Sequence, residues 1–275
     1  MVEEQLPTEG ENTLETIFVL LRAATKVDFT HYKHTTLKRR ILRRMVLYQI
    51  ERFEDYVTYL QNHPAEVQAL YEDVLINVTS FFRDFQAFDA LKTQVFPIIS
   101  KDKSSRIPIR IWVAGCSTGE EAYSIAICLL EFLETQPIKP PIQIYATDIS
   151  ENAIEKARFG IYKHSQVGDI SPERLRRFFV QLNDGYQISK SVRELCVFAK
   201  QNLAADPPFS KLDLISCRNV MIYFGVTLQK KILPIFHYGL KATGFLMLGT
   251  SETVGEFLDL FSLVDKKYKI YARKL

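Results

Sequence analysis

The chain has 275 residues, of which 47% are hydrophobic and 24% are charged. This composition is typical of a globular protein with enough apolar material for one large or two smaller domains. The formal net charge of +3 is too small to indicate a nucleic-acid-binding protein. No apolar run approaches the roughly 20 residues of a membrane span, and the acidic N-terminus lacks the apolar region of a signal peptide. We therefore expect a cytoplasmic protein with no direct membrane insertion.

The first part of the chain is expected to be helical. Residues 1–13 are polar and are predicted to be disordered, and residues 14–100 are predicted to form a helical domain and linker. Apolar periodicity predicts helices near 14–25, 35–49, 52–62, 65–82 and 85–98. The polar segment "KDKSSRIP" follows and ends in proline, which is typical of a domain boundary.

The second helix carries a cluster of basic residues, here called the basic face. The members are Arg39, Arg40, Arg43 and Arg44. At about 100° per residue these four side chains share one arc, opposite an apolar stripe. Two interpretations stay open: a solvated helix face, or a docking surface for an acidic protein helix.

Residues 101–275 alternate between strand and helix patterns. The segments "IRIWVAG" and "IQIYATD" read as buried strands, each followed by a helical segment, which predicts βαβ units in a doubly wound, mostly parallel sheet. The second of these helices is expected to begin after Ser150 and to stop at Gly160. "LCVFAK", "LDLISC" and "GFLMLGT" read as further strands, and "KYKIYA" as an edge strand.

A small antiparallel insertion is predicted at about residues 171–200. Ser171 and Pro172 are expected to begin a short helix there, and "FVQLNDGYQIS" reads as a hairpin that turns at Asn183-Asp184-Gly185. The four cysteines form no C-x-x-C pair and stand in apolar surroundings, so we expect free buried thiols and no metal site.

The loop at 115–119 reads "GCSTG" and fits the nucleophile elbow G-x-S-x-G of serine hydrolases. Its context disfavours a nucleophilic Ser117. The loop follows the first strand of the α/β region rather than a central one, and His237, a possible triad partner, lies in a predicted helix. Two glutamates come directly after the loop and would oppose a developing oxyanion.

A cofactor site fits this loop better. A first strand, a Gly-bearing loop and a helix N-terminus form the crevice in which open α/β sheets bind ligands. Asp148 ends the next strand, where its carboxylate could accept hydrogen bonds from ribose hydroxyls. The two acids would repel a pyrophosphate, so S-adenosylmethionine fits better than NAD. Ser117 and Glu120 also match a capping box, which would leave Glu121 available to the ligand.

Several motifs occur in the order of a known family. They are "INVTSFFRD", "AGCSTGEEAYSIA", "ATDIS", "QNL", "SCRNVMIYF" and "GTSET". With them the sequence resembles the CheR-type chemotaxis receptor methyltransferases from about residue 14 to its end. The resemblance implies an enzyme that transfers methyl from S-adenosylmethionine to glutamate side chains of chemoreceptor cytoplasmic helices, leaving S-adenosylhomocysteine. It also implies that residues 14–100 recognise the substrate and that residues 101–275 bind the cofactor.

The resemblance implies site residues as well. Cofactor contacts are expected at Asn77, Thr79, Arg83, Glu121, Asp148, Asn202, Leu203, Arg218 and Asn219. Arg83 and Tyr223 are expected to border the transferable methyl group and are the catalytic candidates. The basic face becomes the candidate docking surface for the substrate helix. A glutamate is already ionised at pH 7, its pKa being about 4.3, so no general base is required.

Other outcomes stay open. The chain could methylate a different substrate, or it could be a catalytically silent module that senses the cofactor. The tight hairpin at 183–185 lacks the longer loop with which some members dock a receptor tail, so we expect recognition that does not use the tail. A monomer is the default expectation, and the receptor and the modified glutamates are not identified.

Overall fold

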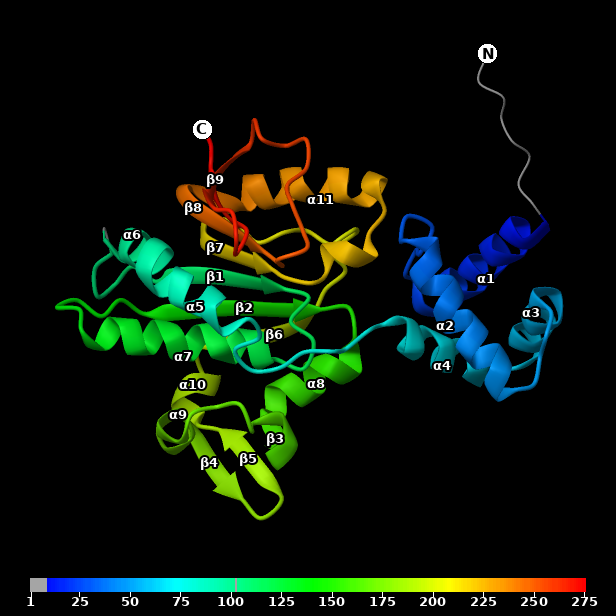
Figure 1. Ribbon diagram of the computed structural model, residues 1–275, viewed down its shortest axis with the longest axis horizontal. Coiled ribbons are helices and arrows are strands. Elements are labelled where there is room, and N and C mark those ends of the chain that lie inside the picture. The colour runs from blue at the N-terminus through cyan, green and yellow to red at the C-terminus, as the bar shows by residue number, and fades with distance from the viewer. Residues whose placement is uncertain (1–8, 102) are drawn as a thin grey trace. The chain divides into compact units, whose positions relative to one another are not determined.

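The computed structural model describes residues 9–101 and 103–275 and divides into two compact units. The first unit comprises the chain up to Ile76 together with Tyr223–Gln229, and the second comprises Asn77–Ile222 and Lys230–Leu275 (Figure 1). The units part at Ile76, whereas the sequence predicts a change of domain near residue 100. Residues 1–8, most of the segment predicted to be disordered, lie outside the described residues, and residues 9–13 of that segment are helical.

Four helices make up the N-terminal part of the first unit. They are α1 (Glu9–Thr25), α2 (His34–Leu47), α3 (Phe53–Asn62) and α4 (Pro64–Val74). Their apolar stripes meet in a core that includes the fully buried side chains of Ile17, Leu21 and Ile41. The helix predicted over 65–82 is wrong beyond Val74, because Leu75 turns into an extended conformation and the following residues form an irregular segment.

The second unit contains a seven-stranded sheet in the order β6-β2-β1-β7-β8-β10-β9. The strands are β1 (Ile109–Ala114), β2 (Ile142–Asp148), β6 (Cys196–Lys200), β7 (Leu212–Cys217), β8 (Leu240–Leu248), β9 (Phe261–Asp265) and β10 (Ile270–Arg273). The first five strands in this order pair in parallel, and β10 runs antiparallel to both of its neighbours. The predicted doubly wound, mostly parallel sheet is confirmed.

The prediction of an edge strand at the end of the chain was wrong. β10 lies between β8 and β9, and its residues Ile270 and Tyr271 are buried. The edge strand on this side of the sheet is β9, which is hard to predict because "FSLVD" ends in a charge and has little alternation.

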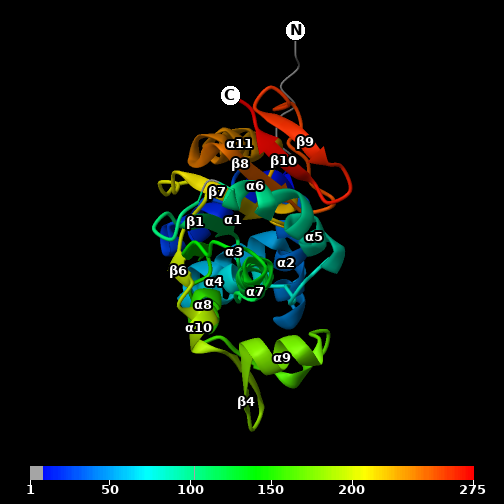
Figure 2. The ribbon, with the colours of Figure 1, turned by 90° about the vertical axis from the view of Figure 1, so that its left-hand side faces the viewer.

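Helices cover both faces of the sheet. They are α5 (Phe85–Ala90), the π-helical turn η1 (Leu91–Val95), α6 (Phe96–Ser100), α7 (Glu120–Glu134), α8 (Glu151–Phe159), α10 (Lys190–Arg193) and α11 (Val226–Gly239). Figures 1 and 2 show α7 and α11 on opposite sides of the strands. The strand β1 serves both faces: Ile111 packs in the core with α7, and the Trp112 ring meets Phe236 of α11 edge-on at 5.5 Å.

The ends of α8 are as predicted. The Ser150 side chain accepts a hydrogen bond from the N–H of Ala153 at 3.2 Å, and Gly160 ends the helix with a φ of 60°. The single helix predicted over 85–98 is instead interrupted by η1.

A three-stranded antiparallel sheet, in the order β3-β5-β4, forms a small subdomain with α9. Its elements are β3 (Ile161–Lys163), η2 (His164–Gln166), α9 (Pro172–Phe178), β4 (Phe179–Leu182) and β5 (Gly185–Ile188). The predicted hairpin is confirmed, and β3 is an addition. Arg174 ties the subdomain to α7 with hydrogen bonds to Glu131 of 2.7 and 2.9 Å, and its guanidinium lies 4.2 Å from the centre of the Phe82 ring.

Candidate cofactor-binding site

The parallel strands end together at one edge of the sheet. Ala114 pairs with Thr147, Asp148 pairs with Lys200, and Cys217 pairs with Leu248. The loops after β1, β2, β6, β7 and β8 therefore converge there, and this is the edge at which open α/β sheets bind ligands.

Asp148 is fixed at this edge by backbone amides from two loops. Its Oδ2 accepts a hydrogen bond from the N–H of Ser117 at 2.8 Å, and its Oδ1 accepts one from the N–H of Ser150 at 2.9 Å. Burial raises the pKa of the Asp148 carboxyl above its ordinary value, and these amides offset only part of that rise. The carboxylate is thus oriented before any ligand arrives.

Ser117 stands in a conformation that few residues adopt. Its φ is 49°, and its side chain is buried at 7% exposure. The predicted capping box is wrong, because the N-cap of α7 is Gly119 and the Ser117 Oγ has no hydrogen-bond partner among the described groups. A buried hydroxyl without a partner, next to an oriented carboxylate, fits a ligand that carries ribose hydroxyls or a polar amino-acid group.

The glycines of the loop are required by neighbouring protein atoms. A Cβ on Gly115 would lie 2.3 Å from Cγ2 of Val220, and a Cβ on Gly119 would lie 2.9 Å from the Cβ of Ala157. Both glycines also have positive φ values, of 74° and 97°. The loop can therefore take its path only with glycine at both positions.

Glu121 lies at the start of α7 and is held from β7. Its Oε1 accepts a hydrogen bond from the Ser216 hydroxyl at 2.7 Å, and its Oε2 lies 3.4 Å from Nη1 of Arg218. The Glu121 side chain keeps 14% exposure, so this carboxylate can still reach a cationic ligand.

The Arg218 guanidinium is buried and binds other groups of the protein. Its side chain is only 1% exposed, and Nη2 donates to the Asp84 carboxylate at 2.7 Å and to the carbonyl of Arg83 at 2.9 Å. The family resemblance predicts Arg218 as a cofactor contact. In the structure its guanidinium joins Glu121 to the segment of residues 77–84.

That segment follows α4 and has no regular secondary structure. Phe82 and Asp84 have φ values of 50° and 60°, and the N–H of Phe82 donates to the Ser124 hydroxyl at 2.9 Å. Arg83 is half-buried and donates to the carbonyl of Val78 at 3.3 Å. Of the other two predicted contacts, Asn77 is exposed and Thr79 is half-buried.

Asn202 and Leu203 follow β6 after one intervening residue, Gln201. The Asn202 side-chain carbonyl accepts a hydrogen bond from the N–H of Ala204 at 2.9 Å, so this asparagine forms a local turn. Gln201 connects the turn to β2, because its N–H donates to the carbonyl of Asp148 at 2.9 Å. Leu203 is half-buried.

Asn219 follows β7 with a φ of 60°, and its N–H donates to Glu252 at 2.9 Å. Glu252 lies within "GTSET", and Asp84 and Ser216 lie within "INVTSFFRD" and "SCRNVMIYF", but none of the three is among the predicted site residues. Tyr223, the other catalytic candidate, belongs to the helical unit, where its carbonyl accepts a hydrogen bond from the N–H of Lys33 at 2.9 Å.

The basic face of α2 is divided by burial. Arg39 and Arg43 are exposed, and Arg40 is half-buried. Arg44 points inward: its Nε donates to Oε1 of Glu66 at 2.8 Å, Nη2 pairs with the other oxygen, and Nη1 lies 3.4 Å from Asp73. Arg44 is therefore a structural residue, which the helical wheel could not distinguish from its neighbours.

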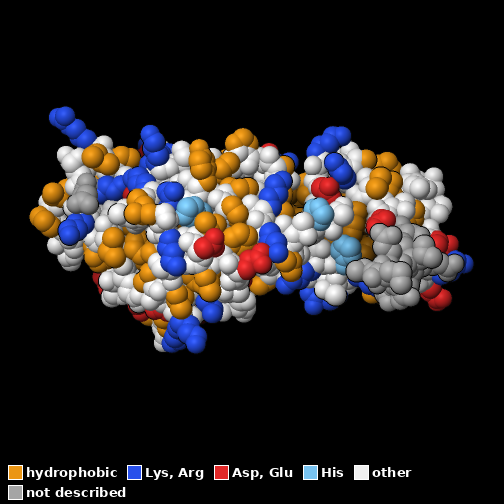
Figure 3. Space-filling model, turned by 90° about the horizontal axis from the view of Figure 1, so that it is seen from above, with side chains coloured by type: hydrophobic (Ala, Val, Ile, Leu, Met, Phe, Trp, Pro, Cys, Tyr) orange, Lys and Arg blue, Asp and Glu red, His pale blue; other side chains and the backbone are white. Residues whose placement is uncertain are grey.

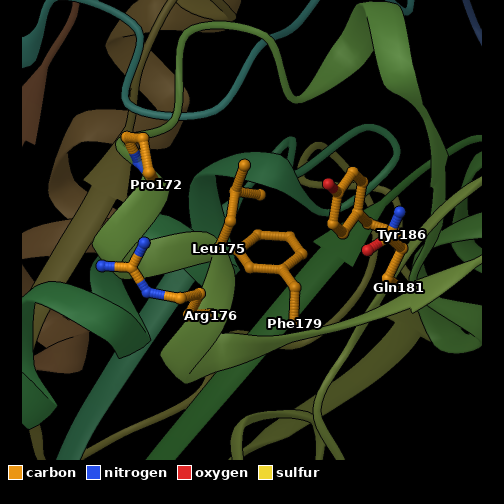
Figure 4. Close-up of a pocket in the computed structure, with 6 residues that line it drawn as sticks. All are labelled: Pro172, Leu175, Arg176, Phe179, Gln181 and Tyr186. Carbon is orange, nitrogen blue, oxygen red and sulfur yellow. The ribbon is translucent and has the colours of Figure 1, made fainter.

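Away from this edge, the small subdomain contains a cavity of about 230 Å³. The cavity is lined by Pro172, Leu175, Arg176, Phe179, Gln181 and Tyr186, and Figure 4 shows Leu175 beside the Phe179 ring. On the face seen in Figure 3, Lys and Arg side chains are dispersed among hydrophobic and neutral ones.

Within the described residues, no three His, Cys, Asp or Glu side chains form a metal-binding group. No described helix is long and apolar enough to cross a membrane.

Known proteins resemble the chain over both units. Residues 12–75 match the family model of the CheR methyltransferase all-alpha domain, and residues 77–270 match that of the CheR methyltransferase SAM-binding domain. A chemotaxis protein methyltransferase of Borreliella burgdorferi is 32% identical over 250 residues, which is 88% of either chain. One from Vibrio parahaemolyticus is 38% identical over 192 residues, covering 68% of this chain and 69% of that one.

A longer relative also matches. An uncharacterized 104.1 kDa protein of Rhodobacter capsulatus is 35% identical over 263 residues, which is 96% of this chain. The chain spans 28% of the length of that relative.

Proposed function

The chain belongs to the CheR methyltransferase family, whose SAM-binding domain it contains, and from this premise we propose that it methylates chemoreceptors. The acceptors would be glutamate side chains on the receptor cytoplasmic helices, and the products would be glutamate methyl esters and S-adenosylhomocysteine. Chemotaxis protein methyltransferases with 32% and 38% identity support this choice of substrate.

The observation that carries the proposal is the set of polar groups around the loop at 115–119. Asp148 offers an oriented carboxylate, Ser117 offers a buried hydroxyl without a protein partner, and Glu121 offers a second carboxylate. These groups suit a ligand with a ribose and a positive charge, and they contain no cationic cradle for a phosphate.

Different residues would bind different parts of the cofactor. S-adenosylmethionine, when bound, supplies a methyl group on a positively charged sulfur. Asp148 would accept hydrogen bonds from the ribose, and Glu121 would hold the ammonium group. Asn77, Thr79, Asn202, Leu203 and Asn219 remain proposed contacts from the surrounding loops. Arg218 would act through Glu121 and Asp84, which it contacts at 3.4 and 2.7 Å.

Arg83 is the proposed orienting group for the incoming carboxylate, and Tyr223 the proposed wall of the methyl pocket. The acceptor glutamate is ionised at neutral pH, with a pKa of about 4.3 in water, so the enzyme needs no base to activate it. The rate enhancement would come from holding the two reactants in line and excluding water.

The exposed part of the basic face is the proposed docking surface. Arg39 and Arg43 lie beside Leu42 and Val46, which are 42% and 75% exposed. A surface with both basic and apolar side chains fits an amphipathic helix that carries acidic residues. The β4–β5 turn is tight, as the sequence predicts, and we propose that recognition does not require a receptor tail.

The test is transfer of labelled methyl from the cofactor to purified receptor cytoplasmic fragments. We expect label on receptor glutamates that is released by mild base, and loss of transfer with the variant Asp148→Ala. Cofactor binding without transfer to any fragment would favour the sensing module. Base-stable label, or label on another protein, would favour a methyltransferase of a different substrate.

A further inference from the structure

One buried carboxylate joins the loops that follow β7 and β8. Glu252 is 4% exposed. Its Oε2 accepts hydrogen bonds from the N–H groups of Gly249 at 2.6 Å and Asn219 at 2.9 Å, and its Oε1 accepts one from the N–H of Ile222 at 3.0 Å. Two of these three donors come from a loop that is more than 25 residues earlier in the chain, so Glu252 fixes the path of a segment other than its own.

The turn that Glu252 holds includes a residue in an uncommon backbone conformation. Asn219 has a φ of 60°, in the left-handed region. Asparagine adopts this conformation more readily than most residues, but the conformation still has to be stabilised by an interaction. The segment between β7 and the short helical turn η3 (Met221–Tyr223) pairs with no strand. The carboxylate accepts the N–H groups of Asn219 and Ile222 and so favours this conformation of the turn.

The space beside the Glu252 carboxylate does not admit a side chain at residue 249. A Cβ on Gly249 would lie 2.7 Å from Oε2 of Glu252 and 2.8 Å from the backbone nitrogen of Asn219. Glycine is therefore required at this position by the approach of the two loops, although its φ is not in the left-handed region.

The held turn contacts the cofactor-binding loop on one side and the segment of residues 77–84 on the other. Val220 occupies the space in which a Gly115 side chain would lie, with 2.3 Å between the hypothetical Cβ and Cγ2. Arg218, one residue before Asn219, reaches Glu121 and Asp84. A shift of the turn would therefore move the loop that carries Ser117 and would break the contacts of Arg218.

We propose that Glu252 is a positioning residue for methyl transfer, acting by holding the turn from Arg218 to Ile222. The proposal deepens the function proposed above and rests on it for its kinetic part. Glu252 itself would touch neither the cofactor nor the acceptor, and its effect would pass through the backbone of Asn219 and Ile222.

The same loop offers a matched control. Glu256 lies four residues after Glu252 and pairs with Lys230 at 2.8 Å, but both side chains are more than half exposed. An exposed ion pair contributes little to stability. Glu256→Gln therefore makes the same chemical change, in the same loop, without touching the turn.

The experiment compares Glu252→Gln with Glu256→Gln in the full chain. An amide in place of the carboxylate points an N–H₂ group at backbone donors, and the loss of a charge-assisted hydrogen bond corresponds to about a ten- to hundredfold effect. We expect kcat to fall by this factor in Glu252→Gln while the cofactor Kd weakens less, because Asp148 and Asn202 are held by other loops. Glu256→Gln should retain the kcat and Kd of the wild type.

Amide hydrogen exchange provides a readout that does not depend on turnover. The N–H groups of Asn219 and Ile222 should exchange slowly in the wild type and in Glu256→Gln, and at least about tenfold faster in Glu252→Gln. Equal exchange rates in all three proteins overturn the proposal, whether or not the wild type transfers methyl. Absence of methyl transfer by the wild type would instead refute the proposed function.

Two further outcomes also decide the matter. An unchanged kcat in folded Glu252→Gln, with an active wild type, contradicts the proposal. So does a loss of activity that is fully explained by the fraction of unfolded protein. If Glu252→Gln does not fold, Glu252→Asp keeps the charge and withdraws the carboxylate by one methylene group, and the same split between kcat and Kd is expected for it.

Discussion

The backbone N–H of Ser117 donates a hydrogen bond of 2.8 Å to the carboxylate of Asp148, across the carboxyl ends of the neighbouring strands β1 and β2. This bond orients the carboxylate, and it also holds Ser117 in a left-handed conformation in which the hydroxyl is buried without a protein partner. The two residues thus belong to one arrangement, and it can be tested from either side.

Removing the Ser117 hydroxyl should separate binding from stability. In Ser117→Ala, we expect the cofactor Kd to weaken by about two- to tenfold, the equivalent of one lost hydrogen bond. The melting temperature should not fall, since the hydroxyl has no partner in the protein to lose. Calorimetric titration and thermal unfolding measure the two quantities. A lower melting temperature with an unchanged Kd would show that the hydroxyl is structural.

Cofactor affinity should depend on the protonation of Asp148. Burial raises the pKa of this carboxyl above 3.8, so it takes up a proton at a higher pH than an ordinary aspartate does. Affinity should be constant above the raised pKa and decline as the pH falls through it, because a protonated carboxyl accepts fewer hydrogen bonds from ribose hydroxyls. Titrations over a pH series measure this.

The variant Asp148→Asn is the control for that series. Glu120 is buried in the same region and also has a raised pKa, so the pH dependence could arise from either carboxyl. Asp148→Asn should bind weakly with little dependence on pH. A variant that kept the full pH dependence would assign it to Glu120.

The effect of Asp148 on stability has the opposite sign. Its pKa is higher in the folded protein than in the unfolded chain, so between these two pKa values the folded protein binds more protons. The contribution of Asp148 to the free energy of unfolding therefore falls as the pH rises from the unfolded pKa to the folded pKa.

Arg44 should matter for folding and not for docking. The Glu66 side chain is 2% exposed, and Arg44→Ala would leave it without its cationic partner at a cost of about 3–5 kcal/mol in the free energy of unfolding. Arg43→Ala, on the exposed side of the same helix, should change it by less than about 0.5 kcal/mol. Urea unfolding measures both. The pair Arg44→Met with Glu66→Gln should recover much of the loss, because it removes the unpaired charge and keeps an acceptor for the Tyr56 hydroxyl, and no recovery would contradict this account.

Charge reversal of Arg39 and Arg43 tests the docking surface. We expect Arg39→Glu with Arg43→Glu to raise the KM for receptor fragments severalfold, to weaken its dependence on salt, and to leave the cofactor Kd unchanged. Steady-state kinetics at two ionic strengths provide the measurement. An unchanged KM would return the exposed arginines to the role of a solvated helix face.

The sequence was sufficient for the features that local chemistry determines. The N-cap at Ser150, the stop at Gly160 and the hairpin at residues 183–185 each depend on a few adjacent residues, and the structure has all three. The alternation of strands and helices was also enough to place Asp148 at the ligand-binding edge of a parallel sheet.

Features that depend on distant partners were not predictable in the same way. Ser117 and Glu120 have the spacing of a capping box, but the amide of Ser117 is engaged by Asp148 and the helix begins after Gly119. Arg44 looked like its neighbours on the helical wheel until Glu66, from another helix, was seen to pair with it. Glu252 could not be singled out from the sequence, since two of its three hydrogen-bond donors, Ile222 and Asn219, are 30 and 33 residues away.

The segment Tyr223–Gln229 has a consequence for the order in which the protein is assembled. This segment clusters with the helical unit, where Phe224 is 4% exposed and meets the Tyr32 ring edge-on at 5.1 Å. The helical unit therefore lacks part of its own core until the ribosome has translated past residue 229, by which time most of the sheet unit has been synthesised. A fragment that ends at residue 76 would expose Tyr32. The last contacts of the helical unit cannot form until the segment Tyr223–Gln229 has been synthesised.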